Sequence, residues 1–272
     1  MESKNPRAGL NNPVQRGIGK AEAALEWIYP SHFSTTAVIA KHLQIERTNA
    51  GNLLGRLVKQ GALKRVECDE LQGANLFMLT PDGVEEALLL GVPAWEYDTR
   101  PSSINHERIR HDIGVQWIAS HTIQSLADKG VQVTRMEPDH ILRDGSPGKL
   151  PDAVLTLEGG HKVSIEFERS EKTGERLDRF LASIADDLAN GSYAKTIVAS
   201  RLPRIVKNYT DRLNSVITLY EKNPVSHRWQ AIGTTTVPSE LKARISFKHF
   251  PELGAVLSPV TWGRKNQKGV AA

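Results

Sequence analysis

The stretch GNLLGRLVKQGALKRVECDELQGANLFMLTPDGVEEAL, residues 51–88, changes its hydrophobic period twice. Between residues 48 and 60 apolar side chains recur at the spacing of one helix face, which predicts an amphipathic helix that ends at Gly61. The segments ALKRVEC and ANLFMLT then alternate around the polar tip DELQG, which predicts two paired strands. A further helix is predicted to follow, capped by Thr80 or Asp82.

Two more helices are predicted before this stretch. KAEAALEWIY, residues 20–29, has the apolar spacing of an amphipathic helix, and Ser34 is expected to cap a second one. That second helix and the helix over 48–60 form a helix-turn-helix. Together with the strand pair, residues 20–92 resemble the winged-helix family. The resemblance implies a DNA-binding module or, in a minority of the family, a protein-interaction module.

The helix over 48–60 leaves polar and basic side chains on its outer side. Such side chains read base edges and bind phosphates when a helix enters the major groove. The predicted DNA-binding residues are Arg47, Thr48, Asn49, Asn52, Arg56 and Lys59. Because asparagine near the start of an exposed helix also serves as a local cap, the two asparagines are open to either interpretation.

Charge is distributed unevenly along the 272 residues. The net charge is +4 at pH 7, and both ends carry a basic excess, which suits a polyanionic partner or ordinary solubilising tails. The predicted organisation is a basic flexible N-terminus over 1–19, a winged-helix domain over 20–92, a linker over 93–103, a second domain over 104–260 and a basic tail over 261–272.

The single cysteine, Cys68, cannot form an intramolecular disulfide, which favours a reducing compartment. The chain has no apolar signal segment and no run of about 18 apolar residues, the length needed to span a bilayer. We therefore expect a soluble cytoplasmic protein with no membrane partner.

A long helix is predicted over INHERIRHDIGVQWIASHTIQSLADKG, residues 104–130. Glu107 and His111 are four residues apart in it and would share one face. Such a pair can act in a functional site or simply support the helix at its surface.

A hairpin is predicted over LPDAVLTLEGGHKVSIEFERSEKT, residues 150–173. Both strands alternate, and a three-residue loop over 159–161 brings their apolar faces together. This register pairs Ala153 with Phe167. It places Asp152 opposite Glu168, with Glu166 diagonal to it.

Carboxylates brought close together repel one another and weaken the hairpin. A divalent cation would relieve the repulsion, and Mg²⁺ or Mn²⁺ prefers oxygen ligands together with substrate phosphates. The predicted ligands are Asp152, Glu166 and Glu168, with Glu107 or His111 positioning the metal or assisting proton transfer. The alternative is a polar sheet face exposed to solvent, because alternating strands expose acids routinely.

PDAVLTLEGGHKVSIEFER resembles the PD-(D/E)XK nuclease superfamily, whose core carries Pro-Asp on one strand and Glu-x-Lys on the next. The resemblance implies that Asp152 and Glu166 match the motif acids and that Glu107 matches an acid on a preceding helix. The chain departs from the motif at its lysine, where Glu168 stands, although Lys172 could supply the positive charge. The implied fold class is α/β (α+β), a winged helix followed by a restriction-endonuclease-like mixed sheet.

The remaining chain is predicted to complete this α/β core. Helices are expected over GERLDRFLASIADDLAN and PRIVKNYTDRLNSVITLYEK, and strands at KTIVAS and RWQAIGTTT. Basic residues near the second of these helices are candidate phosphate ligands, or part of an ordinary solvated helix face. They are Arg201, Arg204, Lys207 and Arg212.

The order of the two domains, with NHERIRHD opening the second, resembles the MOB-C class of plasmid mobilisation relaxases and the related replication-relaxation proteins. The resemblance implies a metal-dependent endonuclease that nicks double-stranded DNA at a plasmid transfer origin, with relaxosome or coupling proteins as partners. One alternative is a non-catalytic DNA-binding regulator of plasmid replication or transcription with a degenerate nuclease fold. Another is a restriction-type enzyme that cuts both strands.

Overall fold

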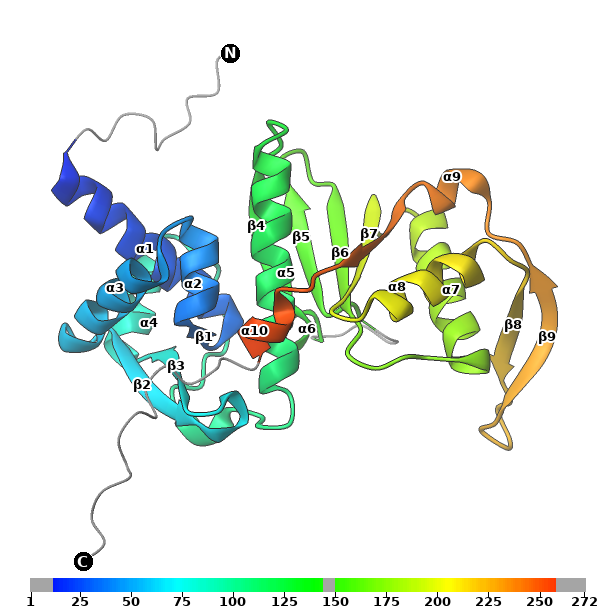
Figure 1. Ribbon diagram of the computed structural model, residues 1–272, viewed down its shortest axis with the longest axis horizontal. Coiled ribbons are helices and arrows are strands. Elements are labelled where there is room, and N and C mark those ends of the chain that lie inside the picture. The colour runs from blue at the N-terminus through cyan, green and yellow to red at the C-terminus, as the bar shows by residue number, and fades with distance from the viewer. Residues whose placement is uncertain (1–11, 144–149, 258–272) are drawn as a thin grey trace, which may run out of the picture. The chain divides into compact units, whose positions relative to one another are not determined.

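The computed structural model describes residues 12–143 and 150–257 (Figure 1). The predicted basic tail over 261–272 and most of the predicted basic N-terminus lie outside the described residues. No helix within the described ranges is both long and apolar enough to cross a membrane.

The first unit contains the helices α1 (Pro13–Ser31), α2 (Thr36–Leu43), α3 (Arg47–Lys59) and α4 (Pro81–Leu89). Helix α1 is longer than predicted, because the side chain of Asn12 caps it ahead of the apolar spacing. Thr35 caps α2 by accepting the backbone N–H of Val38 at 3.3 Å. The cap predicted at Ser34 is therefore one residue too early, and Ser34 lies in a short strand instead.

Three antiparallel strands complete the first unit in the order β1-β3-β2. They are β1 (Ser34–Thr35), β2 (Leu63–Cys68) and β3 (Ala74–Leu79), and the 3₁₀ turn η1 (Asp69–Leu71) forms the tip between β2 and β3. The two predicted strands are thus present and paired, from Leu63 opposite Leu79 to Cys68 opposite Ala74. Three helices followed by this strand pair form a winged helix, as predicted.

Helix α4 packs unusually close to the start of β2. The cap of α4 is Thr80, whose side chain accepts the N–H of Gly83 at 3.1 Å. A Cβ atom on Gly83 would lie 1.9 Å from the carbonyl oxygen of Ala62. Only glycine allows this approach, so the absence of a side chain at residue 83 fixes how α4 meets the wing.

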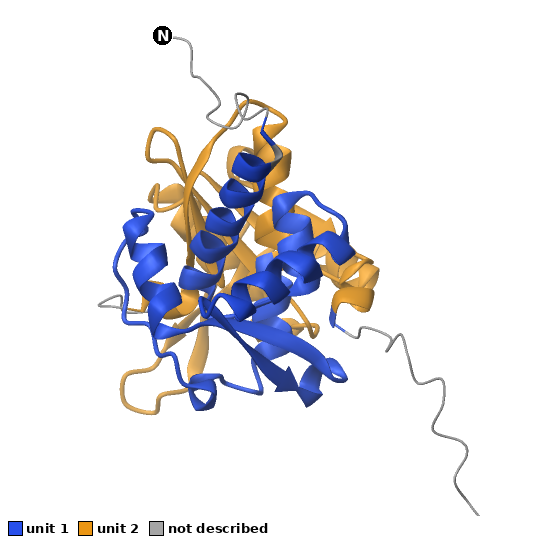
Figure 2. Cartoon of the chain, turned by 90° about the vertical axis from the view of Figure 1, so that its left-hand side faces the viewer, with its two compact units in different colours: residues 1–116, 257–272 blue, residues 117–256 orange. Residues whose placement is uncertain are grey.

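The chain divides into its two compact units inside α5 (Ile109–Ala127), between residues 116 and 117 (Figure 2). This point lies beyond the predicted linker over 93–103, because that segment is bound to the winged helix. The Tyr29 hydroxyl donates to the carbonyl of Trp95 at 3.1 Å. The Tyr97 hydroxyl donates at 2.6 Å to the carbonyl of His32, the residue after α1. A 3₁₀ turn, η2 (Pro101–Ser103), ends the segment.

The second unit is built on a five-stranded mixed sheet in the order β10-β7-β6-β5-β4. The strands are β4 (Val133–Pro138), β5 (Ala153–Leu157), β6 (Lys162–Phe167), β7 (Lys195–Ser200) and β10 (Ile245–His249). Neighbouring strands from β4 to β6 are antiparallel, whereas β6, β7 and β10 run parallel. The predicted mixed sheet is therefore present.

The helices of this unit are α6 (Asp139–Leu142), α7 (Gly174–Ala189), α8 (Pro203–Leu213), α9 (Ser239–Lys242) and α10 (Leu253–Leu257), the last of which ends in the first unit. Residues of α7 and α8 pack on Val198 of β7 around the fully buried ring of Tyr209. The helix predicted to start at Pro203 is correct only to Leu213. The rest of that segment is β8 (Ile217–Lys222), which pairs with β9 (Trp229–Thr235).

Candidate functional site

The outward side of α3 carries every residue of that helix predicted to bind DNA. Ala50, Leu53, Leu54 and Leu57 are buried, so the opposite side of the helix faces solvent. The exposed set consists of Arg47, Thr48, Asn49, Asn52, Arg56 and Lys59. A helix with one apolar side against its own domain and a polar outer side has the arrangement of a recognition helix.

The charged residues of α3 are all basic: Arg47 stands at its start, and Arg56 and Lys59 stand in its last turn. Within the described parts of the chain, Arg47, Arg56 and Lys59 form no ion pair. Nothing here competes with an external anion for these cations. The surface is therefore suited to phosphate groups.

The wing differs in charge from α3. Its tip exposes Glu67 and Asp69. Glu70 is bound, since its carboxylate lies 2.9 Å from Nδ1 of His106 and its carbonyl accepts from Nε of Arg110 at 2.7 Å. Hydrogen bonds from its own backbone N–H, from the Cys68 thiol and from His106 lower the pKa of Glu70. The exposed charges of α3 are therefore basic, whereas those of the wing tip are acidic.

Glu107 and His111 do not share a helix face. The helix α5 begins at Ile109, so Glu107 lies in the turn before it, with its backbone N–H donating to Oδ1 of Asn105 at 3.1 Å. Glu107 is exposed, and His111 has Nδ1 3.2 Å from Oδ1 of Asp112. The prediction failed because an asparagine turn precedes the helix.

The hairpin of β5 and β6 has a different register from the predicted one. Ala153 pairs with Ile165 and Leu155 with Val163, a shift of two residues from the predicted pairing. The backbone N–H of Leu157 donates to the carbonyl of His161 at 2.8 Å, which makes residues 158–160 the loop. The apolar faces still coincide, because a slip of two residues preserves the alternation.

The shifted register brings Asp152 beside Glu166, and not opposite Glu168. The backbone N–H of Asp152 donates to the carbonyl of Ile165 at 3.0 Å, and Oδ2 of Asp152 accepts the N–H of Phe167 at 2.7 Å. These contacts fall on the two neighbours of Glu166 in the chain. Glu166 is itself only 6% exposed. A solvent-facing sheet surface, the alternative interpretation, is therefore wrong for this strand.

Glu168 is committed to other partners. Its carboxylate forms a salt bridge with Lys172 through Oε1, and the Tyr209 hydroxyl donates to Oε2 at 3.4 Å. Lys172 also lies over the Phe180 ring, 4.6 Å from the centroid. Burial and the charge of Glu168 raise the pKa of Tyr209. The Lys172 ammonium is therefore paired with Glu168, the residue that stands where the motif would have lysine.

The predicted metal ligands do not form one cluster. The described residues contain no group of three or more His, Cys, Asp or Glu side chains placed to hold a metal ion. Asp152 and Glu166 remain next to each other in the register of the hairpin, whereas Glu168 is paired with Lys172 and Glu107 is an exposed residue of the other unit. A pair of carboxylates fits Mg²⁺, which is commonly bound by one or two carboxylates with waters and substrate phosphates.

The basic residues around α8 are mostly engaged by acids. Arg204 lies 3.5 Å from Glu171, and Lys207 lies 2.6 Å from Asp211, with both basic side chains exposed. Arg212 is partly buried and binds Asp178. The phosphate-binding role predicted for Arg204 and Lys207 stays a prediction, whereas Arg212 has a structural role.

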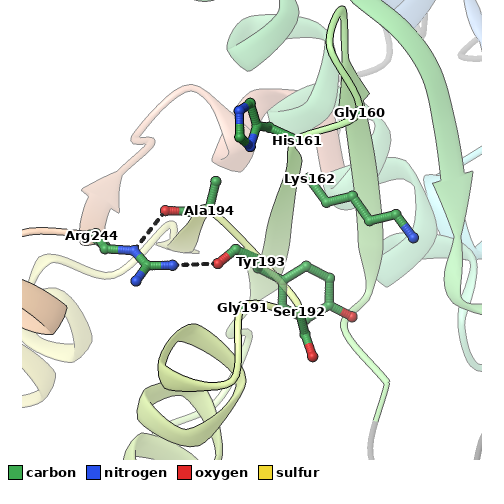
Figure 3. Close-up of a pocket in the computed structure, with 8 residues that line it drawn as sticks. All are labelled: Gly160, His161, Lys162, Gly191, Ser192, Tyr193, Ala194 and Arg244. Atoms are coloured by element: carbon green, nitrogen blue, oxygen red, sulfur yellow. Dashed lines mark hydrogen bonds between the residues drawn. The ribbon is translucent and has the colours of Figure 1, made fainter.

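A hollow of about 540 Å³ lies where β6, β7 and β10 begin (Figure 3). The lining residues come from the start of β6 and the two residues before it, from the segment before β7, and from the residue before β10: Gly160, His161, Lys162, Gly191, Ser192, Tyr193, Ala194 and Arg244. Arg244 is fixed there by the carbonyls of Tyr193 and Ala194, at 2.6 Å and 2.9 Å. No sequence pattern pointed to this site, because its walls come from separate parts of the chain.

No protein-family model matches the sequence, and no curated protein matches it either. Solved structures align with part of the chain. A MepR mutant from a multidrug-resistant S. aureus clinical isolate is 18% identical, covers 38% of this chain and 78% of its own, and has a TM-score of 0.26. A mutant of Lactococcus lactis ZitR is 19% identical, covers 41% of this chain and 74% of its own, and has a TM-score of 0.25. The transcriptional regulator Tm0710 from Thermotoga maritima is 20% identical, covers 49% of this chain and 85% of its own, and has a TM-score of 0.23.

Proposed function

We propose that this chain binds double-stranded DNA by placing α3 in the major groove. The observation that carries the proposal is the exposed, acid-free side of α3. Arg47, Arg56 and Lys59 are suited to phosphates. Asn49 and Asn52 have the amide groups that recognise the edge of adenine.

Replacing Arg56 and Lys59 together by Ala should weaken duplex binding and flatten its salt dependence. Fewer counterions leave the duplex when two phosphates are no longer neutralised, so the slope of log affinity against log salt should fall by about 1.8. Fluorescence anisotropy over a range of salt concentrations measures this slope. The matched control is Lys222→Ala with Lys248→Ala, which removes two exposed cations from the other unit. An equal effect of both pairs would remove α3 from the interface.

A second function is favoured by the position of Asp152 beside Glu166. With Lys172 paired to Glu168, the residue that stands where the motif would have lysine, these two acids support a metal-dependent endonuclease of the relaxase type. Its substrate would be a plasmid transfer origin, and its partners relaxosome or coupling proteins. Asp152 and Glu166 would hold Mg²⁺ or Mn²⁺, which supplies polarisation of a phosphodiester when bound. Lys172 would neutralise Glu168 by the ion pair between them.

Incubation of the full chain with supercoiled plasmid bearing the cognate origin should give open-circular DNA in the presence of Mn²⁺ and none in EDTA. The expected difference arises because the proposed reaction needs a metal ion held by the two carboxylates, and EDTA removes that ion. Gel electrophoresis separates the products. Linear DNA would indicate a restriction-type enzyme that cuts both strands. Unchanged supercoiled DNA, with origin binding retained, would indicate a DNA-binding regulator.

A further inference from the structure

The hollow at the start of β6, β7 and β10 is lined by basic groups and by no acid. His161 directly precedes β6, Lys162 is the first residue of β6, and both are exposed, while Arg244 is the residue before β10. Within the described chain, the side chains of His161 and Lys162 have no hydrogen-bonding or ionic partner. A concave surface that combines the unpaired ammonium of Lys162 with an unpaired imidazole and no lining carboxylate attracts an anionic ligand.

Arg244 gives this hollow a rigid wall. Its Nε and Nη2 donate to the carbonyls of Ala194 and Tyr193, so the guanidinium is held in one orientation. The Nη1 group makes no hydrogen bond within the described residues. Because the side chain is already ordered, an anion that binds Nη1 meets a small entropic cost.

The basic groups do not point at one spot. Figure 3 shows His161 and Arg244 on one side of the hollow, while Lys162 extends to the other side, where the Tyr193 ring and Ser192 lie. A single phosphate cannot satisfy groups spread around an open hollow of about 540 Å³. A chain of phosphates can do so, and the Tyr193 ring offers an aromatic surface for a base.

We propose that this hollow binds a segment of single-stranded DNA through its phosphodiester backbone. Lys162, His161 and Arg244 contact phosphates, and Tyr193 provides a stacking surface for a base. The binding is independent of α3, which takes the duplex. None of the residues that line the hollow belongs to the pair Asp152 and Glu166, but the charge of Glu166 reaches Tyr193, where burial and the charges of Asp187 and Glu166 raise the pKa of the hydroxyl.

The test uses the full chain carrying Arg56→Ala and Lys59→Ala, so that the proposed contribution of α3 is removed. Binding of a fluorescently labelled oligothymidylate is followed by anisotropy. Adding Lys162→Ala and His161→Ala should weaken binding by about tenfold or more, since a charge-assisted hydrogen bond is worth at least that factor. The salt slope should also fall by about 0.7 for each phosphate that the variant no longer neutralises. Lys162→Arg, which keeps the charge, should restore most of the affinity that Lys162→Ala removes.

Two further variants separate this site from general positive charge. Lys222→Ala removes an exposed cation of the same unit outside the hollow and should leave oligothymidylate binding unchanged. Tyr193→Leu should weaken binding by about fivefold or more through loss of stacking, whereas Tyr193→Phe should retain it. Arg244 is left intact because it holds the loop before β7. Absence of oligothymidylate binding, or equal effects of Lys162→Ala and Lys222→Ala, would overturn the proposal.

Discussion

Replacing Asp178 by Ala should lower the free energy of unfolding by about 3 kcal/mol, the lower end for breaking a buried ion pair. Asp178 is 2% exposed and binds Arg212 through two hydrogen bonds of 2.5 Å, and it also accepts the N–H of Thr218 at 2.9 Å. The substitution leaves the Arg212 guanidinium and the Thr218 N–H without their acceptor. The lower end applies because Arg212 is 34% exposed and can turn to water. Chemical unfolding at neutral pH measures the difference.

The same ion pair should be sensitive to acid. Burial alone would raise the pKa of Asp178, but hydrogen bonds from Arg212 and Thr218 outweigh it and lower that pKa. The stabilisation is therefore complete above the unfolded pKa, about 3.9, and is lost as the pH falls through the lower folded value. From about pH 5 to 8, the difference in unfolding free energy between the parent and Asp178→Ala should stay constant at its full value. Below about pH 4 this difference should shrink.

The control lies in the same region of α8. Asp211 and Lys207 form an ion pair at 2.6 Å whose side chains are 61% and 75% exposed. Asp211→Ala should change the unfolding free energy by less than about 1 kcal/mol, because exposed pairs are screened by water. If Asp178→Ala costs no more than Asp211→Ala, the pair of Asp178 and Arg212 does not hold α7, α8 and β8 together.

The winged helix could be predicted from the sequence because its signals are local. The apolar spacing before Gly61, the alternation of the two wing strands and the cap at Thr80 each act within a few residues. Each predicted element is present in the structure. The helix cap at Ser34 was the exception: the cap is Thr35, one residue later, whose side chain accepts the N–H of Val38.

The hairpin register could not be decided by alternation alone. A shift of two residues leaves the same side chains on the same face, so the predicted and observed registers satisfy the hydrophobic pattern equally. The turn decides between them. The backbone N–H of Leu157 donates to the carbonyl of His161, which closes the loop over 158–160 and not over 159–161. Gly159 and Gly160, with φ of 93° and 84°, fall inside both loops and do not distinguish them. Because of this difference in register, Asp152 lies opposite Glu166 and not opposite Glu168.

The incorrect second half of the helix predicted from Pro203 has a similar origin. Its apolar residues permit a helix or a strand, and the strand β8 is stabilised by partners distant in sequence. Thr218 donates its backbone N–H to Asp178, and Ile217 pairs with Thr235. Neither partner can be identified from the spacing within the segment, so the local pattern predicted the wrong element.

Asp152→Asn and Glu166→Gln should each abolish Mn²⁺-dependent nicking while leaving duplex binding intact. The two residues are the neighbouring carboxylates of the second unit, whereas duplex binding is assigned to α3 of the first. Mn²⁺ at 100 times its Kd should stabilise the parent by about 2.7 kcal/mol, and this stabilisation should be absent in both variants. Without metal the variants should be at least as stable as the parent, because one of two repelling charges is gone. Thermal melting with and without Mn²⁺ measures both effects.

Two other substitutions distinguish a two-carboxylate site from a general loss of negative charge. Glu158→Gln removes an exposed acid from the hairpin loop and should change neither nicking nor the response to Mn²⁺. Glu168→Gln removes the partner of Lys172 and should lower the melting temperature, yet it should keep the response to Mn²⁺ because Glu168 is not one of the paired acids. If Glu168→Gln loses the response together with Asp152→Asn, all three acids bind the ion. If the parent shows neither the response nor nicking, the regulator function remains.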